Sequence, residues 1–254
     1  MKIGVLTYHC VPNFGAQLQT ISTVGFLKKM GHEPIVLNWY PKELEDMYSK
    51  RIPSAQVKAH NKFMNENIPI SDLCRTDVDL AKVIDDLHLE AIFEGSDALF
   101  KYIPKKKRVY FAKKKLHLVH VNITPVDVLD GNCFFASFYK YLKNKIPLVG
   151  FSISSQNCPY QLMDNQEKNE MSKALSVFKE LTVRDEWTKE MVKSLNPKRG
   201  DIKITPDPVF SFNSNCYIAI PSRQEILKKF NLPENYIRRN RQTLWGGCAD
   251  ANPK

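Results

Sequence analysis

The sequence lacks closely spaced cysteines, and this excludes two classes of small stabilised domain. A disulfide framework and a structural zinc site both need paired cysteines at short, regular spacing. No C-x-x-C pair occurs, so we expect reduced thiols, as in a cytoplasmic protein. The cysteines are scattered along the chain as Cys10, Cys74, Cys133, Cys158, Cys216 and Cys248.

Long apolar runs are also missing. No stretch approaches the roughly 20 apolar residues of a membrane-spanning helix, and no basic-then-apolar leader precedes the first apolar segment. We therefore expect a soluble cytoplasmic protein without a transmembrane segment, for which any membrane association is peripheral.

The sequence has no G-x-G-x-x-G after its first apolar segment, and Asn38 and Trp39 stand where a dinucleotide fold places an acidic residue. Both absences argue against a nicotinamide site. Metal-ligand spacing is missing as well, because the one close histidine pair, His117 and His120, points to opposite faces if its segment is a strand. We expect neither a cofactor nor a metal.

The composition favours a large folded domain with an anionic partner. The chain has 254 residues, of which 43% are hydrophobic and 11% aromatic. This is enough to bury a substantial core. The net charge of +10 favours a partner such as a phosphate compound, nucleic acid or acidic lipid.

The order of apolar segments predicts the fold. Residues 3–7 and 35–40 read as strands on either side of a helix over 16–30, which is a βαβ unit with parallel strands. We therefore expect an α/β fold with a doubly wound, mostly parallel, Rossmann-like sheet. Further strands are expected at 89–93, 146–155, 180–183 and 201–205. Helices are expected at 55–65, 77–87, 164–178 and after the cap Asp185. Residues 71–73 could begin the helix that continues over 77–87.

Two basic clusters occupy residues 105–108 and 113–115. They could contact nucleic acid, acidic polysaccharide or a membrane surface. The aromatic residues among them are too few for a base-stacking platform, so a solvated basic loop is the favoured interpretation and no specific nucleic-acid partner is expected.

Polar residues follow the first strand and begin the first helix. Gly15 allows close backbone approach, and Asn13 and Gln17 offer amides, so the three could hold a phosphate or a sugar; a plain turn with a helix cap is the alternative. His9 could transfer protons near neutral pH, or it could be a hydrogen-bonded loop histidine.

Later strand ends carry further candidates. Gly95, Ser96 and Asp97 could bind a hydroxyl or position a proton, although Asp97 could equally cap a helix. Arg184 suits a carboxylate or phosphate, with an ion pair to Asp185 or Glu186 as the alternative. The remaining candidates are the strand-end hydroxyls of Ser152 and Ser154, for which turn chemistry is the alternative.

Several motifs in this order resemble the polysaccharide pyruvyl transferase family across residues 2 to about 212. They are Asn13-Phe14-Gly15-Ala16-Gln17-Leu18-Gln19, Gly95-Ser96-Asp97, Phe151-Ser152-Ile153-Ser154, Leu181-Thr182-Val183-Arg184-Asp185 and Asp207-Pro208-Val209-Phe210.

The resemblance implies a two-domain glycosyltransferase-B-like fold of which this chain holds the N-terminal half. It also implies transfer of the pyruvyl unit of phosphoenolpyruvate onto a sugar or glycan-lipid of a surface polysaccharide. Arg184 would then bind phosphoenolpyruvate, residues 13–17 the sugar, and His9 or Asp97 would move the proton.

The sequence departs from the family pattern at two places. The usual Gly-Ser-Asp-Gln-x-Trp run reads Gly95-Ser96-Asp97-Ala98-Leu99-Phe100, and the second domain is not evident. We expect a Rossmann-like domain over 1–212, a linker with a short helix over 213–237 and an irregular basic tail over 238–254. The alternatives are a truncated, inactive binding half of such an enzyme and a nucleotide-sugar glycosyltransferase.

Overall fold

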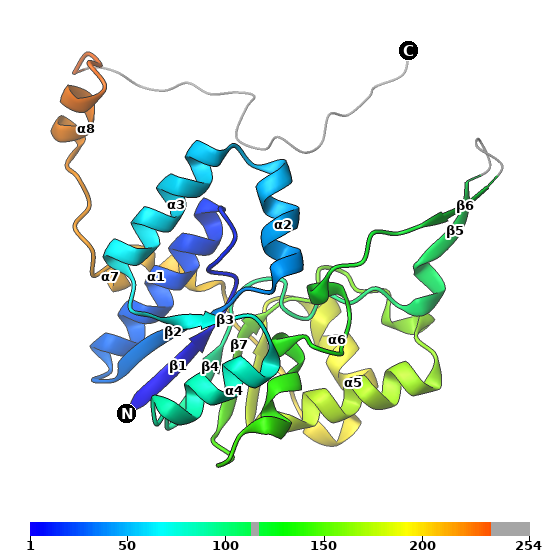
Figure 1. The fold of residues 1–254 in the computed structure, drawn as a ribbon. Coiled ribbons are helices and arrows are strands. Elements are labelled where there is room, and N and C mark those ends of the chain that lie inside the picture. The colour runs from blue at the N-terminus through cyan, green and yellow to red at the C-terminus, as the bar shows by residue number, and fades with distance from the viewer. Residues whose placement is uncertain (113–116, 235–254) are drawn as a thin grey trace. The chain divides into compact units, whose positions relative to one another are not determined.

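The structure is a computed structural model that describes residues 1–112 and 117–234. The chain divides into two units, Met1–Tyr217 and Ile218–Lys254. The first unit contains a seven-stranded sheet (Figure 1). All of the candidate residues lie in this unit. The predicted tail over 238–254 lies outside the described residues.

A seven-stranded sheet forms the centre of the first unit, in the order β3-β2-β1-β4-β7-β8-β9. Every pair of neighbouring strands is parallel. The predicted parallel Rossmann-like sheet is therefore confirmed. The strands are β1 (Lys2–Leu6), β2 (Glu33–Trp39), β3 (Ile70–Cys74), β4 (Ala91–Glu94), β7 (Leu148–Ile153), β8 (Glu180–Val183) and β9 (Lys203–Ile204).

The strand order reverses between β1 and β4, since the chain first builds outward through β2 and β3 and then returns to β4 on the other side of β1. At such a switch point the loops beyond the strands diverge, and a crevice opens at the carboxyl ends. This topology places the turns after residues 6 and 94 side by side.

Helices cover both faces of the sheet. Leu6, Leu37 and Ile92 pack in one core cluster with residues of α4 (Asp77–Asp86), α5 (Asn165–Val177) and α6 (Glu186–Leu195). The buried residues Ile21 and Val24 of α1 (Phe14–Lys29) lie outside that cluster. Strand residues alternate between the two faces, so the sheet is doubly wound, as predicted.

The segment between β2 and β4 contains a strand that the sequence did not predict. Ser71, Asp72 and Leu73 lie in β3, which pairs with β2 at the sheet edge, so the predicted helix start at 71–73 is wrong. The helix instead begins at Asp77 behind the capping box of Thr76. Two helices precede β3, namely α2 (Lys42–Arg51) and α3 (Ser54–Asn67).

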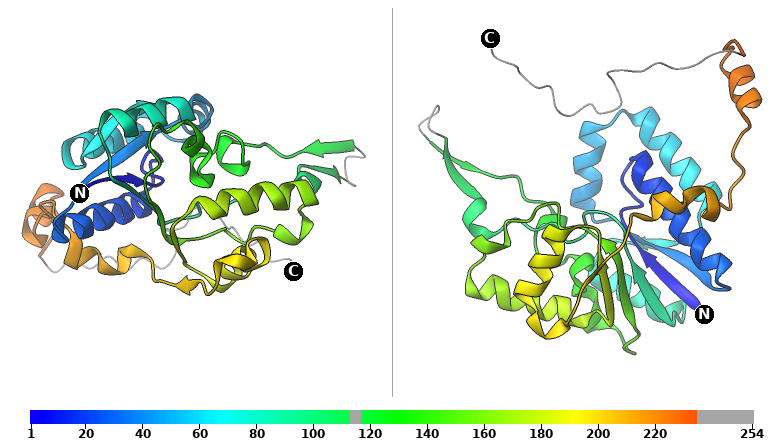
Figure 2. Two further views of the ribbon diagram at one scale, coloured as in Figure 1. Left: turned by 90° about the horizontal axis from the view of Figure 1, so that it is seen from below. Right: turned by 180° about the vertical axis from the view of Figure 1, so that it is seen from behind.

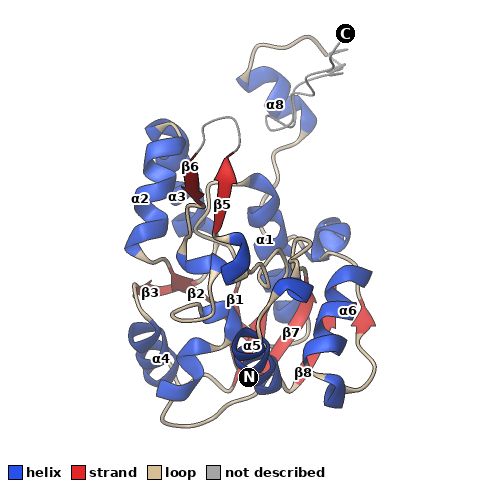
Figure 3. Cartoon of the chain, turned by 90° about the vertical axis from the view of Figure 1, so that its right-hand side faces the viewer, coloured by secondary structure: helices blue, strands red, loops and turns tan. Residues whose placement is uncertain are grey.

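The first basic cluster begins with a 3-10 turn over Lys105–Lys107, and the second, residues 113–115, lies outside the described residues. The chain on either side of the second cluster forms a hairpin. β5 (Val109–Ala112) and β6 (His117–His120) pair antiparallel in a separate two-stranded sheet. The pair projects away from the main sheet in both views of Figure 2, and Figure 3 shows its two strands side by side.

The first unit extends to Tyr217, whose hydroxyl donates to the Asn67 carbonyl at 2.9 Å. The short helix α7 (Phe212–Asn215) lies against α1, where a methyl group on Gly25 would meet the Asn215 carbonyl oxygen at 1.7 Å. In the second unit, α8 (Arg223–Lys229) begins at the capping box of Ser222 and Glu225.

No helix in the described part of the chain is long and apolar enough to cross a membrane. Among the described cysteines, Cys10, Cys74, Cys133 and Cys158 are free thiols.

Candidate active site at the carboxyl ends of the strands

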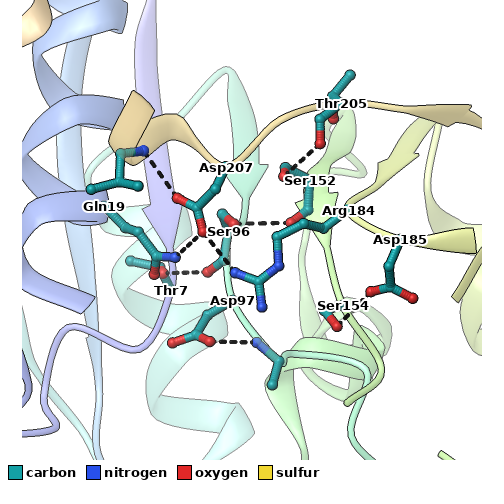
Figure 4. Close-up of polar contacts among 12 residues, drawn as sticks. Thr7, Gln19, Ser96, Asp97, Ser152, Ser154, Arg184, Asp185, Thr205 and Asp207 are labelled. Atoms are coloured by element: carbon teal, nitrogen blue, oxygen red, sulfur yellow. Dashed lines mark hydrogen bonds and ion pairs between the residues drawn. The ribbon is translucent and has the colours of Figure 1, made fainter. Parts of the chain in front are cut away.

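A chain of hydroxyl groups links the ends of four strands (Figure 4). Thr7 Oγ1 donates to the Ser96 carbonyl at 3.1 Å, and Ser96 Oγ donates to the Ser152 carbonyl at 2.9 Å. Ser152 Oγ in turn donates to the Thr205 carbonyl at 3.1 Å. Because Ser96 and Ser152 are fully buried, these bonds fix the turns beyond β1, β4, β7 and β9 relative to one another.

The turn after β4 adopts a backbone that few side chains tolerate. Gly95 has a φ of 135°, and a Cβ there would meet the Phe151 carbonyl oxygen at 2.0 Å. Asp97 has a φ of 118° and Ser152 a φ of 52°. Such conformations persist where the surrounding structure enforces them, and they cluster at functional sites. Here they bring the β4 turn against the end of β7.

Asp97 is held beside the end of β7. Its carbonyl accepts from Ser154 N at 2.8 Å, and its Oδ1 accepts from Ala98 N at 2.7 Å. No helix follows it before residue 105, so it does not cap a helix. Burial raises the pKa of Asp97, and the nearby Arg184 guanidinium opposes part of that rise. The carboxyl is therefore predisposed to hold a proton.

Arg184 lies between Asp207 and Asp97 (Figure 4). Its Nη1 forms an ion pair with Asp207 at 2.7 Å, so the partner is not Asp185 or Glu186. The same Asp207 oxygen accepts from Gln19 Nε2 at 2.5 Å. These contacts connect β8, the segment after β9 and α1.

Asp185 and Ser154 form a second polar link. Ser154 Oγ donates to Asp185 Oδ2 at 2.7 Å, and Asp185 Oδ1 accepts from Thr188 N at 2.7 Å. The second contact is the helix cap that the sequence predicted for α6. The first contact holds the Ser154 side chain, at the end of β7, against the start of α6.

His9 is 2% exposed and packed beneath the first loop. Its Nδ1 lies 3.1 Å from the Thr7 carbonyl and its Nε2 lies 3.0 Å from Asn38 Oδ1. Burial lowers the pKa of His9. The geometry favours the alternative of a hydrogen-bonded loop histidine, which supports the loop carrying Tyr8 and Asn13.

The start of α1 combines an exposed helix cap with a buried glutamine side chain. Asn13 is the N-cap, and its Oδ1 accepts from Gly15 N at 2.8 Å. Gln17 is buried in the next turn of the helix. No acidic residue occurs in the first turn, so the positive end of the helix dipole is not offset there.

A cavity of about 380 Å³ opens at this edge of the sheet. Two of the predicted residues, Asn13 and Asp97, line it. Gly95, Ser96, Ser152, Ser154 and Arg184 instead build the frame behind it, through the contacts described above. The polar side chains of the wall that the sequence did not single out are Tyr8, Tyr48, Arg51, Lys101, Asn122, Thr124, Asp127 and Gln156.

The missed residues come from segments far apart in the sequence. Tyr48 and Arg51 belong to α2, Lys101 follows β4, and Asp127 follows β6. No spacing rule joins them, because only the tertiary fold brings these segments to one cavity. The position of Lys101, soon after the Gly95-Ser96-Asp97 turn, was the one available signal.

A second, apolar cavity of about 440 Å³ lies between α1 and α3. Asn13 and Gln17 line it together with Phe14, Leu18 and Phe63. Asn13 therefore belongs to both cavities. Gln17 lies on the apolar side, away from Asp97.

Among the described residues, no cluster of three or more His, Cys, Asp or Glu side chains could hold a metal ion.

The sequence matches a family model described as polysaccharide pyruvyl transferase over residues 13–245. The match spans most of the chain and includes every strand from β2 to β9. The chain belongs to the polysaccharide pyruvyl transferase family. The resemblance carried by the ordered motifs is thereby confirmed, and family membership implies a transferase.

No curated protein matches the chain. Among solved structures, the UDP-glucuronic acid 4-epimerase of Bacillus cereus in complex with NAD is similar over 89% of this chain and 95% of that chain. The identity is 9% and the TM-score is 0.24. We draw nothing from so loose a superposition, and the Rossmann-like assignment rests on the sheet order.

Proposed function

We propose that this pyruvyl transferase family member moves the pyruvyl unit of phosphoenolpyruvate onto hydroxyl groups of a sugar in a surface polysaccharide or glycan-lipid. One observation carries the proposal. Asn13 and Asp97, from two motifs about eighty residues apart, line the same cavity at the switch point of the sheet. We place the reaction in the cytoplasm.

Asp97 is the proposed acid. Burial raises its pKa and so favours the protonated form, and Asp97 would give that proton to the methylene carbon of the enolpyruvyl group. That carbon becomes a methyl group and the adjacent carbon becomes cationic. One sugar hydroxyl adds to the cation and loses its proton. Phosphate then departs, and a second hydroxyl adds and loses its proton, which yields the cyclic ketal and inorganic phosphate.

Arg184 and Asn13 are the proposed substrate contacts. The guanidinium uses Nη1 for Asp207 and lies beside Asp97, so its other donors could reach the substrate carboxylate. Asn13, which lines both cavities, would contact the sugar. His9 is proposed as a positioning residue, because both its nitrogens face protein oxygens.

The deciding experiment incubates the 254-residue chain with phosphoenolpyruvate and a panel of sugars and glycan-lipids. Release of inorganic phosphate together with a new ketal methyl signal in the proton spectrum is the expected result. Phosphoenolpyruvate binding without turnover for any acceptor would instead indicate an inactive binding half. Preferential binding of a nucleotide-diphosphate sugar would indicate a glycosyltransferase.

A further inference from the structure

The cavity wall holds two cationic side chains that the proposed reaction has not used. Arg51 ends α2, and Lys101 lies in the segment after β4; both line the cavity that contains Asp97. They come from different elements and reach the same space, which also receives the hydroxyl-bearing side chains of Tyr8 and Tyr48.

Lys101 is held in place by a buried carboxylate. Its Nζ lies 2.6 Å from Oδ1 of Asp127, whose side chain is 2% exposed, whereas the Lys101 side chain is 37% exposed. The other Asp127 oxygen accepts from Thr124 N at 3.0 Å and from Thr124 Oγ1 at 2.5 Å. Asp127 thus contacts Lys101 through one oxygen and Thr124 through the other, and the exposed side of the ammonium keeps donors for a ligand.

Arg51 keeps its charge available to the cavity. The nearest acidic residues of its helix are engaged elsewhere, because Glu45 pairs with Lys42 and Arg75, and Asp46 pairs with Lys42. Arg51 interacts electrostatically with Tyr48, a neighbouring residue of the same wall. A planar guanidinium at a cavity mouth suits two oxygens of one phosphate.

We infer that Arg51 and Lys101 form the subsite for a phosphate dianion in this cavity, and that Asp127 positions Lys101 for it. The inference rests on the proposed function for the identity of the substrate, phosphoenolpyruvate, but the subsite itself would bind any small phosphate monoester or inorganic phosphate. It also assigns different roles to two cationic regions, with the phosphate at Arg51 and Lys101 and the carboxylate toward Arg184.

The charges of the wall support an anion over a cation. Arg51 and Lys101 carry two positive charges, of which Asp127 offsets one at Lys101, and burial favours the protonated form of Asp97, so the wall keeps a net positive charge. The first turn of α1, which reaches the cavity at Ala16, contains no acidic residue. A bound dianion would therefore meet net positive charge from several directions.

The test is calorimetric titration of the intact chain with inorganic phosphate and, separately, with phosphoenolpyruvate at fixed ionic strength. We compare Arg51→Gln with Lys50→Gln, which removes the same charge from the same helix at a residue outside this cavity wall. Arg51→Gln should weaken binding of both ligands about tenfold, the usual effect of losing a charged hydrogen bond. Lys50→Gln should change it less than about twofold, through screened long-range charge.

Lys101→Met gives the second arm, and it should weaken phosphate binding as Arg51→Gln does. Lys101→Met leaves the buried Asp127 carboxylate without its cation, so the thermal unfolding midpoint of this variant is measured as well. If Lys101→Met does not fold, the double variant Lys101→Met with Asp127→Asn, which removes both charges, replaces it. Equal binding by wild type, Arg51→Gln and Lys50→Gln would overturn the inference, and so would a wild type that does not bind phosphate.

The two proposals fail separately. Arg51-dependent phosphate binding without pyruvyl transfer would contradict the proposed function and support the subsite. Pyruvyl transfer, together with unchanged phosphate affinity in Arg51→Gln and in the Lys101 variant, would contradict the subsite and support the proposed function.

Discussion

The Arg184 guanidinium donates to the Asp207 carboxylate at 2.7 Å and thereby ties the end of β8 to the segment that follows β9. Gln19 donates to the same oxygen at 2.5 Å, so one carboxylate holds three parts of the chain together. Asp207 is 12% exposed and Arg184 is 30% exposed, which makes the pair stronger than a surface ion pair but partly screened.

Arg184→Ala should lower the free energy of unfolding by about 1–2 kcal/mol, because it leaves a mostly buried carboxylate with Gln19 as its remaining side-chain donor. Denaturant unfolding measures the effect. In a double-mutant cycle, Asp207→Asn should recover part of the loss. Strict additivity of the two variants would show that the contact contributes nothing to stability.

Gly95→Ala should destabilise the fold by roughly 3 kcal/mol or more, because the new Cβ would meet the Phe151 carbonyl oxygen at 2.0 Å. Gly31→Ala is the matched control. Gly31 also has a positive φ, of 78°, but nothing lies within 4 Å of the place that a Cβ would take there. Gly31→Ala should therefore lower the free energy of unfolding by only about 1 kcal/mol. Thermal unfolding of both variants separates the steric clash at Gly95 from the general cost of a Cβ at positive φ. Equal losses of stability in the two variants would contradict the predicted clash.

Local signals explain which elements were predictable. The cap Asp185 was identified because a polar cap directly before an apolar-periodic helix is a feature of a few adjacent residues. The predicted strand over residues 180–183 has the observed bounds, because it is a short segment directly before the polar residues that begin the next helix. The βαβ order then fixed the parallel sheet.

Tertiary pairing explains what was missed. Ser71 and Asp72 suit a helix start, yet β3 exists because β2 offers it a pairing edge. In the same way, Lys101 and Asp127 form an ion pair across 26 residues that no local pattern marks. The ion-pair partner of Arg184 is Asp207, which lies beyond the next strand, and not the adjacent Asp185 or Glu186. Contacts between loops of different strands are set by the sheet, so sequence spacing alone does not identify them.

Glu94 is fully buried at the end of β4, and neither carboxylate oxygen has a hydrogen-bond partner among the described residues. Burial raises its pKa well above the usual value. The folded state therefore keeps a proton that the unfolded state loses once the pH exceeds the ordinary value of about 4.3. Stability should fall as pH rises above that point, by about 1.4 kcal/mol per unit until the folded pKa is reached.

Glu94→Gln should abolish this part of the pH dependence, so the variant gains on the wild type as the pH rises above about 4. Urea unfolding at a series of pH values measures it. Glu43→Gln, which changes an exposed carboxylate on α2, should leave the wild-type slope in place. Parallel stability curves for wild type and Glu94→Gln would refute the assignment of a buried neutral carboxyl.

Asp97→Asn tests the proposed acid while preserving shape, since asparagine tolerates the positive φ of 118° at this position. Turnover should fall about a hundredfold or more, because an amide cannot supply the proton that the methylene carbon needs. Asp86→Asn, an exposed carboxylate at the end of α4, should retain wild-type turnover.

The pH profile distinguishes a proton donor from a structural aspartate. The acid must be protonated to act, so wild-type turnover should decline as pH rises through the raised pKa of Asp97. The residual turnover of Asp97→Asn should lack that decline, while phosphoenolpyruvate affinity stays near the wild-type value. If the decline persists unchanged in the variant, the proton comes from another group, and Asp97 serves only to hold the β4 turn against β7 through its contacts with Ala98 and Ser154.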